Sequence, residues 1–270
     1  MPESDQALLI DAARAASEIA MPYWRQTHKS WEKAAGAGPV TEADLAVDEM
    51  LKDRLLAARP GYGWLSEETD DDAARLTRDH VFIVDPIDGT RAFMAGERTW
   101  AHSLAVAHQG QIVAAAIYLP AHDKLYTAAT DDGARLNGQP VRTSSRADLQ
   151  DATILAAKPN FDPRHWPIGL PPVRRQFRAS LAYRLALVAE GRFDAMLTFR
   201  DTWEWDVAAG SLIVKEAGGV VTERYGASPK FNNPMPVLPG LLAAGPLVHR
   251  ELRHYIGDKT SLGQHDRRLP

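Results

Sequence analysis

The sequence predicts a mixed protein of the α+β and α/β classes, because three patterns follow one another along its 270 residues. Helical periodicity dominates up to the Pro-Gly pair at 60–61, short strand-like runs occupy residues 101–136, and strands alternate with helices beyond residue 140. This length suits one large unit or two packed lobes that share a core. We expect one compact unit with a lobe boundary near 142–151, made of an N-terminal α+β lobe (1–145), a C-terminal α/β lobe (146–258) and a loose tail (259–270).

The N-terminal elements are predicted from apolar spacing and from residues that begin or end helices. Apolar side chains recur at helical spacing over residues 4–28, and glycines and a proline at 36–39 break the pattern. Thr41 begins a second helix, with Asp44 three residues later in an imperfect capping box, and a Pro-Gly pair ends it. The next elements are a short strand (62–66), a helix (70–76) and a buried strand (81–84).

The rest of the chain is predicted to form a run of strands, followed by strands that alternate with helices. Four short β-like runs separated by turn residues predict an antiparallel meander (102–107, 111–119, 124–129 and 134–136). Beyond it, the predicted strands are 153–156, 193–198, 220–222 and 241–244, and the predicted helices are 181–190, 205–217 and 247–256.

Composition excludes several classes of function. A net charge of −4 gives no electrostatic support for binding a nucleic-acid polymer. The absence of cysteine excludes disulfides, thiolate catalysis and zinc–sulfur sites. The first residues lack the order of a signal peptide, and no apolar stretch approaches the ~20 residues of a membrane span. We therefore expect a cytoplasmic protein that does not bind membranes.

The most informative segment is Asp-Pro-Ile-Asp-Gly-Thr at positions 85–90, directly after the buried strand 81–84. Asp85 and Asp88 can aim at one point, and oxygen ligands of this kind suit Mg²⁺. If the chain turns helical after Asp88, the amides of Gly89 and Thr90 form an anion site beside the metal. A metal next to a phosphate-sized anion site indicates phosphoryl chemistry.

Two other interpretations of this segment are weighed against that one. Asp-Pro and Asp-Gly pairs are common turn formers, and Asp is a common helix cap, so the motif alone is also consistent with a structural turn. Phosphatases that form an aspartyl-phosphate need a nucleophilic Asp two residues before the second Asp, and Pro86 occupies that position. This excludes the aspartyl-phosphate mechanism.

Three further acidic residues stand where a strand end or helix start would present them. Glu67 follows a strand-like run, Asp206 begins an Ala-rich helix, and Asp44 lies in the first turn of the second predicted helix. Each of them, taken singly, is also consistent with a helix cap or a solvated charge.

Together these segments resemble the signatures of the inositol monophosphatase superfamily. Trp-Leu-Ser-Glu-Glu-Thr at 64–69, Asp-Pro-Ile-Asp-Gly-Thr at 85–90 and Trp-Asp-Val-Ala-Ala-Gly at 205–210 occur in the family's order and with similar spacing. Residues 39–44 are similar to the family's early segment, and Lys33 lies where the family often has a lysine in its mobile metal-site loop. The resemblance runs from about residue 5 to residue 258.

The resemblance implies a fold, a cofactor and a set of metal ligands. It implies a layered αβαβα sandwich, two or three Mg²⁺ ions per active site, sensitivity to lithium, and a homodimer. Most metal ligands would come from the N-terminal lobe. Carried over to this sequence, the ligands are Glu67, Asp85, the backbone carbonyl of Ile87, Asp88 and Asp206, with Lys33 in the third-metal loop.

The same resemblance suggests how the residues divide the work of hydrolysing a phosphate monoester. Thr90 would accept a hydrogen bond from the attacking water while donating one to Asp44, and Glu67 would help to orient that water. Asp206 and Asp88 would share a second metal that stabilises the leaving oxygen. The expected substrate and phosphate contacts are Gly89, Thr90, Asp88, Asp206, Ser180 and Arg200.

The substrate is the least determined feature, although a small phosphorylated metabolite is expected. Inositol-preferring relatives place an acidic residue about seven positions before the Trp-Asp pair, and here that place holds Thr-Phe-Arg at 198–200. Glu204 before the Trp-Asp pair is similar to the relatives that act on 3′(2′),5′-bisphosphate nucleotides; Arg200 would meet a second phosphate and Phe199 an adenine.

The bisphosphate nucleotide is therefore the first expectation and inositol 1-phosphate the alternative. Histidinol phosphate, fructose 1,6-bisphosphate and a non-catalytic metal-binding regulator are further alternatives. Phe199 and Arg200 are also consistent with purely structural roles, in which Phe199 belongs to the core of a strand and Arg200 is a surface charge. The arginine-rich stretch 158–178 is either an electropositive entrance or a solvated face.

Overall fold

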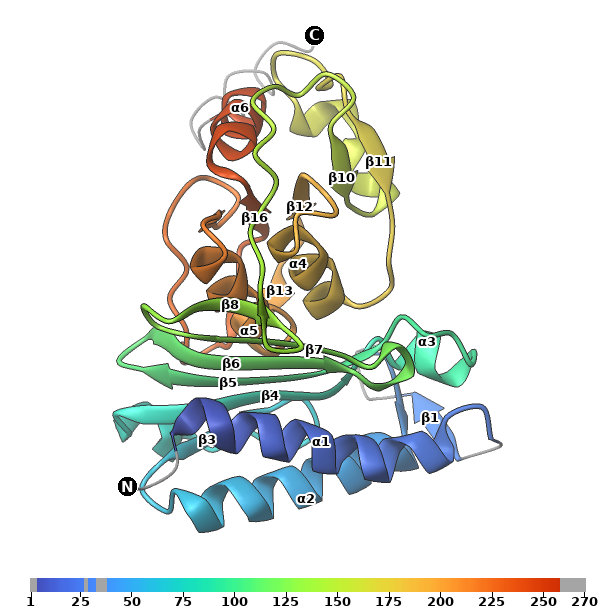
Figure 1. Cartoon of the computed structure of the whole chain (residues 1–270), viewed down its shortest axis with the longest axis vertical. Helices are drawn as coiled ribbons and strands as arrows, with labels where there is room; N and C mark the ends of the chain where they lie inside the picture. Colours follow the sequence, from blue (N-terminus) through green and yellow to red (C-terminus); the bar gives the residue numbers. More distant parts are fainter. Residues whose placement is uncertain (1–3, 27–28, 33–37, 258–270) are drawn as a thin grey trace, which may run out of the picture.

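The computed structural model describes residues 4–26, 29–32 and 38–257, and they form alternating layers of helix and sheet (Figure 1). In order, the layers are a helix pair, a seven-stranded sheet, a second helix pair, a five-stranded sheet and a last layer that contains one α-helix. The αβαβα sandwich expected from the sequence is therefore confirmed. The tail expected at 259–270 lies outside the described residues.

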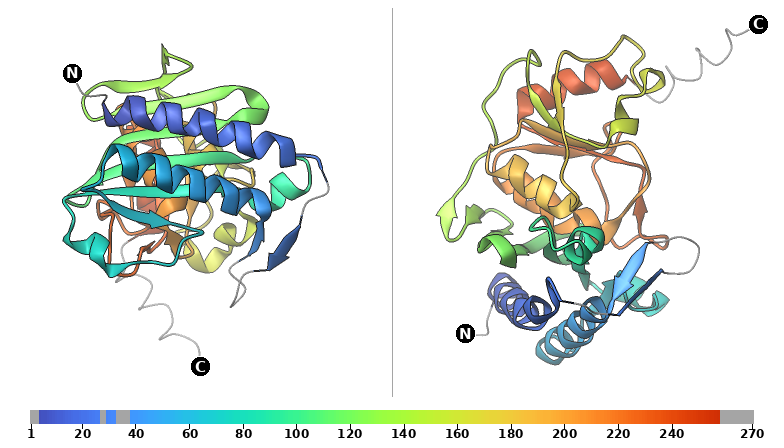
Figure 2. Two further views of the ribbon diagram at one scale, coloured as in Figure 1. Left: turned by 90° about the horizontal axis from the view of Figure 1, so that it is seen from below. Right: turned by 90° about the vertical axis from the view of Figure 1, so that its right-hand side faces the viewer.

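The outer layer consists of α1 (Asp5–Tyr23) and α2 (Glu42–Ala58), which lie side by side across one face of the seven-stranded sheet (Figure 2, left). Ser4 caps α1, and Thr41 forms a complete capping box with Asp44 at the start of α2. Leucine and alanine side chains of both helices pack on the aromatic and aliphatic residues of the sheet.

The seven-stranded sheet has the strand order β3-β4-β5-β6-β7-β8-β9. Only the pair β3–β4 is parallel, and all later pairs are antiparallel neighbours, as in the meander predicted from the sequence. The strands are β3 (Gly63–Ser66), β4 (His80–Asp88), β5 (Ala101–His108), β6 (Gln111–Leu119), β7 (Lys124–Ala129), β8 (Gly133–Leu136) and β9 (Gln139–Pro140).

The five-stranded sheet is mixed and has the order β11-β10-β12-β16-β14. Its strands are β10 (Thr153–Leu155), β11 (Arg174–Gln176), β12 (Ala195–Thr198), β14 (Val220–Thr222) and β16 (Leu241–Ala244). The helices of this half are α4 (Leu181–Ala189) and α5 (Glu204–Glu216) between the sheets, and α6 (Pro246–Ile256) on the far side (Figure 2, right).

Short elements complete the fold. Two small ribbons pair β1 (Ser30–Glu32) with β2 (Pro39–Thr41) and β13 (Thr202–Trp203) with β15 (Val237–Leu238). The short helix α3 (Thr90–Met94) follows β4, and 3₁₀ turns span Ala73–Thr77, Pro120–His122, Lys158–Phe161 and Pro163–His165.

The central helices are buried because both sheets pack against them. Nearly every residue of α4 and α5 is inaccessible to solvent, and one apolar cluster joins them to strands of both sheets. The first sheet ends at Pro140 and the second begins at Thr153, which is where we propose to divide the two lobes of a single unit.

Two differences from the sequence-based prediction concern segments next to the predicted acidic residues. The strand predicted over 81–84 continues to Asp88, because a bulge keeps the Asp-Pro-Ile-Asp segment paired with β5. The helix predicted over 70–76 is only the 3₁₀ turn Ala73–Thr77, capped by Asp72. Within the described part of the chain, no helix combines the length and apolar character needed to cross a membrane.

Candidate active site

Three segments bring acidic side chains to one end of the seven-stranded sheet. Ser66 of β3 pairs with Val84 of β4, and the Glu67 amide donates to the Val84 carbonyl at 3.3 Å, so Glu67 lies beside Asp85. Asp206 comes from the first turn of α5. Carboxylate oxygens of Glu67, Asp85 and Asp206 all lie within 4.8 Å of one another, although the first and the last are 139 positions apart in sequence.

A bulge in β4 separates Asp85 from the fourth acid, Asp88. Asp85 pairs with Ser103 and Asp88 pairs with Ala101, so two residues of β4 lie opposite the single residue His102. The bulge bends the strand, and both carboxylates remain almost fully buried.

His102 stabilises this bulge and is absent from the set predicted from sequence. The side chain is fully buried, and its Nδ1 lies 2.5 Å from the Pro86 carbonyl oxygen. A carbonyl can only accept, so Nδ1 carries the proton, and burial lowers the imidazole pKa to about 4. Its signal in the sequence is an imidazole within an otherwise small and apolar strand.

The N-terminus of α4 holds one oxygen of Asp88. The Ser180 hydroxyl donates to Asp88 Oδ2 at 2.6 Å, and the Ala182 amide donates to the same oxygen at 2.6 Å. Ser180 also caps α4 by accepting from the Tyr183 amide at 2.9 Å. These bonds orient the Asp88 carboxylate, and both of them use Oδ2 and not Oδ1.

The clustered acids shift each other's pKa values upward. Burial, followed by the charges of Glu67, Asp88 and Asp206, raises the pKa of Asp85 well above its usual range. Burial also raises the pKa of Asp88 to about 6, although the Ser180 and Ala182 hydrogen bonds work in the opposite direction. A site that makes several carboxylates difficult to ionise together is one that a cation would stabilise.

A buried arginine lies near the acids. Arg184 on α4 is 5% exposed, donates from Nε to the Arg178 carbonyl at 2.6 Å, and stacks its guanidinium 4.5 Å from the Phe177 ring centre. Its charge opposes the rise in the Asp88 pKa, and burial lowers its own pKa to about 10. Arg184 therefore fixes the segment before Ser180 and adds positive potential at the site.

Thr90 and Asp44 meet at the edge of the acidic cluster. Thr90 Oγ1 lies 3.3 Å from Asp44 Oδ1 and 3.2 Å from the Ile87 carbonyl oxygen, so its one proton can be donated to either acceptor. The other oxygen of Asp44 accepts from the Thr41 amide at 2.8 Å and from the Thr41 hydroxyl at 2.5 Å. The capping box of α2 therefore fixes the orientation of Asp44.

One turn further along α2, Asp48 secures the segment that carries Glu67. Its two carboxylate oxygens accept from the Ser66 hydroxyl and the Thr69 hydroxyl, each at 2.5 Å. Asp48 is 6% exposed and absent from the predicted set. Its signal in the sequence is a second aspartate four residues after Asp44, on the same face of the helix.

Gly89 permits close packing of the turn after Asp88 against Thr99 and Ser180. Its φ angle is +97°, and a Cβ atom there would lie 3.1 Å from the Thr99 carbonyl oxygen and 3.4 Å from Ser180 Cβ. The chain then enters α3, whose first amides, including that of Thr90, have no acceptors within the helix.

Several predicted contacts differ from expectation. Ser180 is fully buried and its hydroxyl is engaged by Asp88, so it positions a carboxylate and does not face a substrate. Phe199 is half-buried, with the Arg224 guanidinium 4.2 Å from its ring centre and Trp166 and His165 also packed on it, so these side chains would compete with an adenine for the ring.

Arg200 and Glu204 lie in different surroundings. Arg200 is exposed, and its charge acts on Arg184. Glu204 is fully buried and accepts hydrogen bonds from Asn232 and Asn233, so it anchors a loop. Lys33 lies outside the described residues.

The donor set fits a hard divalent cation. All side-chain donors in the cluster are carboxylate oxygens, and Asp85 Oδ1 is buried with no hydrogen-bond partner among the described residues. A buried, unpartnered carboxylate oxygen is costly unless a cation or proton satisfies it.

Comparison with known proteins agrees with this geometry. The family model "Inositol monophosphatase family" matches residues 1–257. An inositol-1-monophosphatase of Rhizobium meliloti is 39% identical over 201 residues, covering 69% of this chain and 73% of the relative. The Nus factor SuhB of Pseudomonas aeruginosa is 34% identical over 201 residues, covering 70% of this chain and 73% of that protein.

Solved structures show the same fold over nearly the whole chain. The extragenic suppressor protein suhB of Bartonella henselae has a TM-score of 0.80 and 30% identity, covering 93% of this chain and 98% of that one. An IMPase of Thermotoga maritima has a TM-score of 0.79 and 26% identity, covering 95% and 97%. The chain therefore belongs to the inositol monophosphatase family, whose members are metal-dependent phosphomonoesterases.

Proposed function

We propose that this phosphomonoesterase hydrolyses inositol 1-phosphate in a Mg²⁺-dependent reaction at the Glu67–Asp85–Asp206 cluster. The observation that carries the proposal is the convergence of these carboxylates within 4.8 Å. The hydrogen-bonded Thr90–Asp44 pair at the cluster's edge supplies a group that can orient water.

Glu67, Asp85, Asp88, Asp206 and the Ile87 carbonyl would hold Mg²⁺, which when bound supplies positive charge to phosphate oxygens and lowers the pKa of water. Of its two possible acceptors, Thr90 would donate its proton to Asp44, which would leave the lone pairs of its hydroxyl oxygen to accept from the attacking water. The amides of Gly89 and Thr90 would hold phosphate oxygens. None of these roles requires a covalent phosphoenzyme.

The preference for inositol 1-phosphate over a bisphosphate nucleotide has two supports. Several relatives between 36% and 39% identical are named inositol-1-monophosphatase. The packing of Phe199 against Arg224 and Trp166 favours a structural role for this ring over the adenine contact of the nucleotide interpretation. The proximity of Arg200 to Arg184 still favours a second anionic group, which keeps the bisphosphate as the second candidate.

The test is release of inorganic phosphate from a panel of esters by the purified protein, with and without Mg²⁺ and Li⁺. The panel contains inositol 1-phosphate, adenosine 3′,5′-bisphosphate, histidinol phosphate and fructose 1,6-bisphosphate. We expect the highest kcat/KM for inositol 1-phosphate and no turnover after Mg²⁺ is removed. A higher value for the adenosine bisphosphate that Arg200→Ala abolishes would instead establish the second candidate.

The metal assignment is tested by Asp88→Asn and Asp206→Asn. Each substitution keeps the shape of the side chain but removes a charge, and we expect activity to fall by at least about 100-fold. Asp53→Asn, an exposed aspartate on α2, is the matched control and should retain full activity. Near-normal turnover of Asp88→Asn in millimolar Mg²⁺ would refute the assignment.

The resemblance also predicts a homodimer. Size-exclusion chromatography with light scattering measures the mass of the protein in solution. We expect twice the 29.7 kDa mass of one chain.

A further inference from the structure

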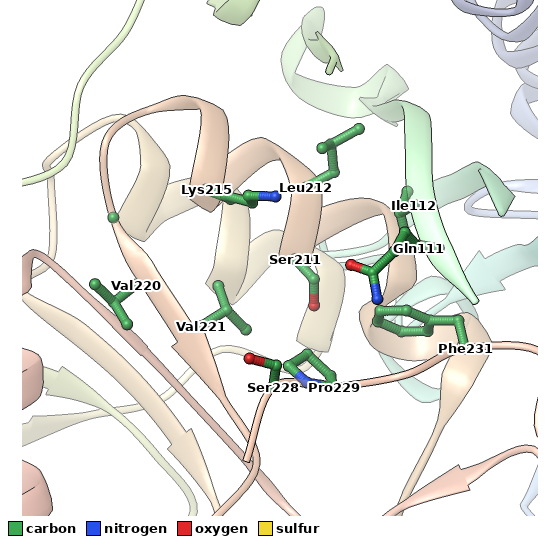
Figure 3. Close-up of a pocket in the computed structure, with 11 residues that line it drawn as sticks. Gln111, Ile112, Ser211, Leu212, Lys215, Val220, Val221, Ser228, Pro229 and Phe231 are labelled. Atoms are coloured by element: carbon green, nitrogen blue, oxygen red, sulfur yellow. The ribbon is translucent and has the colours of Figure 1, made fainter. Parts of the chain in front are cut away.

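A cavity of about 270 Å³ lies away from the acidic cluster, between α5, the start of β6 and the segment that follows β14 (Figure 3). Leu212, Val221 and Phe231 form apolar walls. Gln111 and Ser228 contribute polar groups, and in Figure 3 the Gln111 side chain and the Ser228 hydroxyl lie at its margin. The mechanism proposed above uses none of these residues.

One polar atom in the cavity wall has no partner among the described residues. Ser211 on α5 is 6% exposed, and its hydroxyl oxygen is buried without a hydrogen bond. Serines inside helices commonly donate back to a carbonyl of the preceding turn, and this one does not. A buried hydroxyl without a partner destabilises the fold, and a ligand oxygen that accepts its proton would remove that cost.

The charge at the cavity is a single cation. Lys215 follows Ser211 by one helical turn, so both side chains lie on the same side of α5. Lys215 is exposed and has no hydrogen-bond or ion-pair partner among the residues that the structure describes. No acidic side chain from the described ranges lines the cavity. Apolar walls, the buried Ser211 hydroxyl, the polar groups of Gln111 and Ser228 at the margin and one ammonium group fit an apolar molecule with one carboxylate.

The cavity walls are held in place by hydrogen bonds. The Phe231 amide donates to the Gly110 carbonyl at 3.1 Å, which ties the lower wall to the β5–β6 turn. The next two residues donate their amides to the buried Glu204 at 2.6 and 2.9 Å. Such a cavity needs little reorganisation on binding, as is usual for small-molecule sites.

The cavity is separate from the phosphatase centre. Ser211 follows Asp206 by five residues, which corresponds to about 7.5 Å along α5 and about 140° around its axis. A ligand in the cavity would therefore contact another face of α5 and would not reach the acidic cluster.

We propose that this cavity is a second ligand site for a small carboxylate with an apolar body. The carboxylate pairs with Lys215 and accepts from the Ser211 hydroxyl, and the apolar body contacts Leu212, Val221 and Phe231. This inference does not depend on which ester the phosphatase centre hydrolyses.

The test compares binding of 3-phenylpropionate with that of its neutral amide, 3-phenylpropionamide, by ligand-observed NMR. The protein is used as the full chain with saturating Mg²⁺. We expect the carboxylate to bind and the amide to bind about 10-fold more weakly, because the amide loses a charge-assisted contact. Equal affinities, or no binding of the carboxylate at millimolar concentration, would overturn the proposal.

Two cavity variants and one control test whether the probes bind at this cavity. Lys215→Gln should weaken the carboxylate about 10-fold and leave the amide unchanged. Ser228→Trp, at an exposed position on the rim, should block both probes. Lys52→Gln on α2 is the matched control and should change neither. Carboxylate binding that survives both cavity variants would assign it to another site and contradict the inference.

Measuring phosphate release by the two cavity variants distinguishes failure of the cavity proposal from failure of the proposed phosphatase function. Lys215→Gln and Ser228→Trp should retain normal turnover, because neither contacts the acidic cluster. Loss of turnover in either variant without loss of fold would show that the cavity is not separate from the phosphatase centre.

Discussion

Asp44 has a structural contact on one oxygen and a candidate catalytic contact on the other. Oδ2 closes the capping box of α2 through Thr41, and Oδ1 faces the Thr90 hydroxyl. The cap therefore orients the acceptor for Thr90, and the hydroxyl lone pairs are directed by a residue that the helix start already holds in place. The local capping box at Thr41 thus determines the geometry of the Thr90–Asp44 pair, whose members are far apart in sequence.

Thr90→Ala should lower kcat by at least about 10-fold while leaving Mg²⁺ affinity within a factor of two, because it removes a water-orienting hydroxyl and no ligand. Turnover and Mg²⁺ binding by calorimetry are measured on the same preparations. Thr90→Ser keeps the hydroxyl and should recover most of the activity. If metal affinity collapsed together with kcat, Thr90 would instead be part of the metal site.

The raised pKa of Asp88 predicts how the stability of the metal-free protein depends on pH. Burial raises its pKa from 3.8 to about 6, so the folded protein binds this proton more tightly than the unfolded chain does. The contribution of protonated Asp88 to the stability of the folded protein is fully present below about pH 4 and is lost as pH rises through 6. A pKa difference of this size between the folded and unfolded states corresponds to at most about 3 kcal/mol.

Asp88→Asn should therefore be more stable than the unsubstituted protein at pH 8 in EDTA, and the difference should disappear near pH 4. Urea unfolding at each pH measures it. Adding Mg²⁺ at pH 8 should stabilise only the unsubstituted protein strongly. A difference that stays constant from pH 4 to pH 8 would contradict the raised pKa.

At the scale of elements, the candidate site depends on how segments are tied to their neighbours. The bulge in β4 is supported by His102, the segment after β3 by Asp48, and the Asp88 carboxylate by the start of α4. Each tie comes from a different element and uses a buried polar group. The acids are therefore positioned before any cation binds, which lowers the cost of ordering them.

Asp48→Ala should lower the free energy of unfolding by about 2 kcal/mol, because the Ser66 and Thr69 hydroxyls lose their acceptor. It should also weaken Mg²⁺ binding, because Glu67 follows Ser66 directly. Urea unfolding and calorimetry measure the two effects. Asp53→Asn, exposed on the same helix, serves as the control for a lost charge. Unchanged Mg²⁺ affinity would mean that Asp48 supports the fold alone.

At the scale of the whole molecule, the central helix layer sets the distance between the two sheets. A Cβ atom on Gly210 would lie 2.5 Å from Leu185 Cβ, so α5 and α4 approach as closely as they do only because position 210 is glycine. The same helix carries Asp206, and a change in helix spacing would move that carboxylate relative to Asp85.

Gly210→Ala should therefore destabilise the protein by about 1–3 kcal/mol, although alanine favours a helix by about 1 kcal/mol over glycine. Thermal and urea unfolding measure the change. Gly61→Ala, where no atom of the described residues lies within 4 Å of the added Cβ, should be neutral or slightly stabilising. A stable Gly210→Ala protein would mean that the helices can separate without cost.

Most elements were predictable because they depend on local patterns, whereas the order of the layers was expected only from the family resemblance. The runs 111–119, 124–129, 220–222 and 241–244 match strands residue for residue, since alternation and turn residues act over short distances. The 3₁₀ turn at Ala73–Thr77 was not predictable as such, because Asp72 caps a segment too short to continue as a helix.

The sequence by itself determined the family motifs, the two N-terminal helices with the Thr41 cap, and the identities of the acids. Only the tertiary structure decided that Ser180 turns inward to Asp88, that Arg224 covers Phe199, and that His102 and Asp48 support the site. The physical reason is range: periodicity and capping act within a few residues, whereas burial and hydrogen bonding between distant segments depend on which surfaces the folded chain brings together.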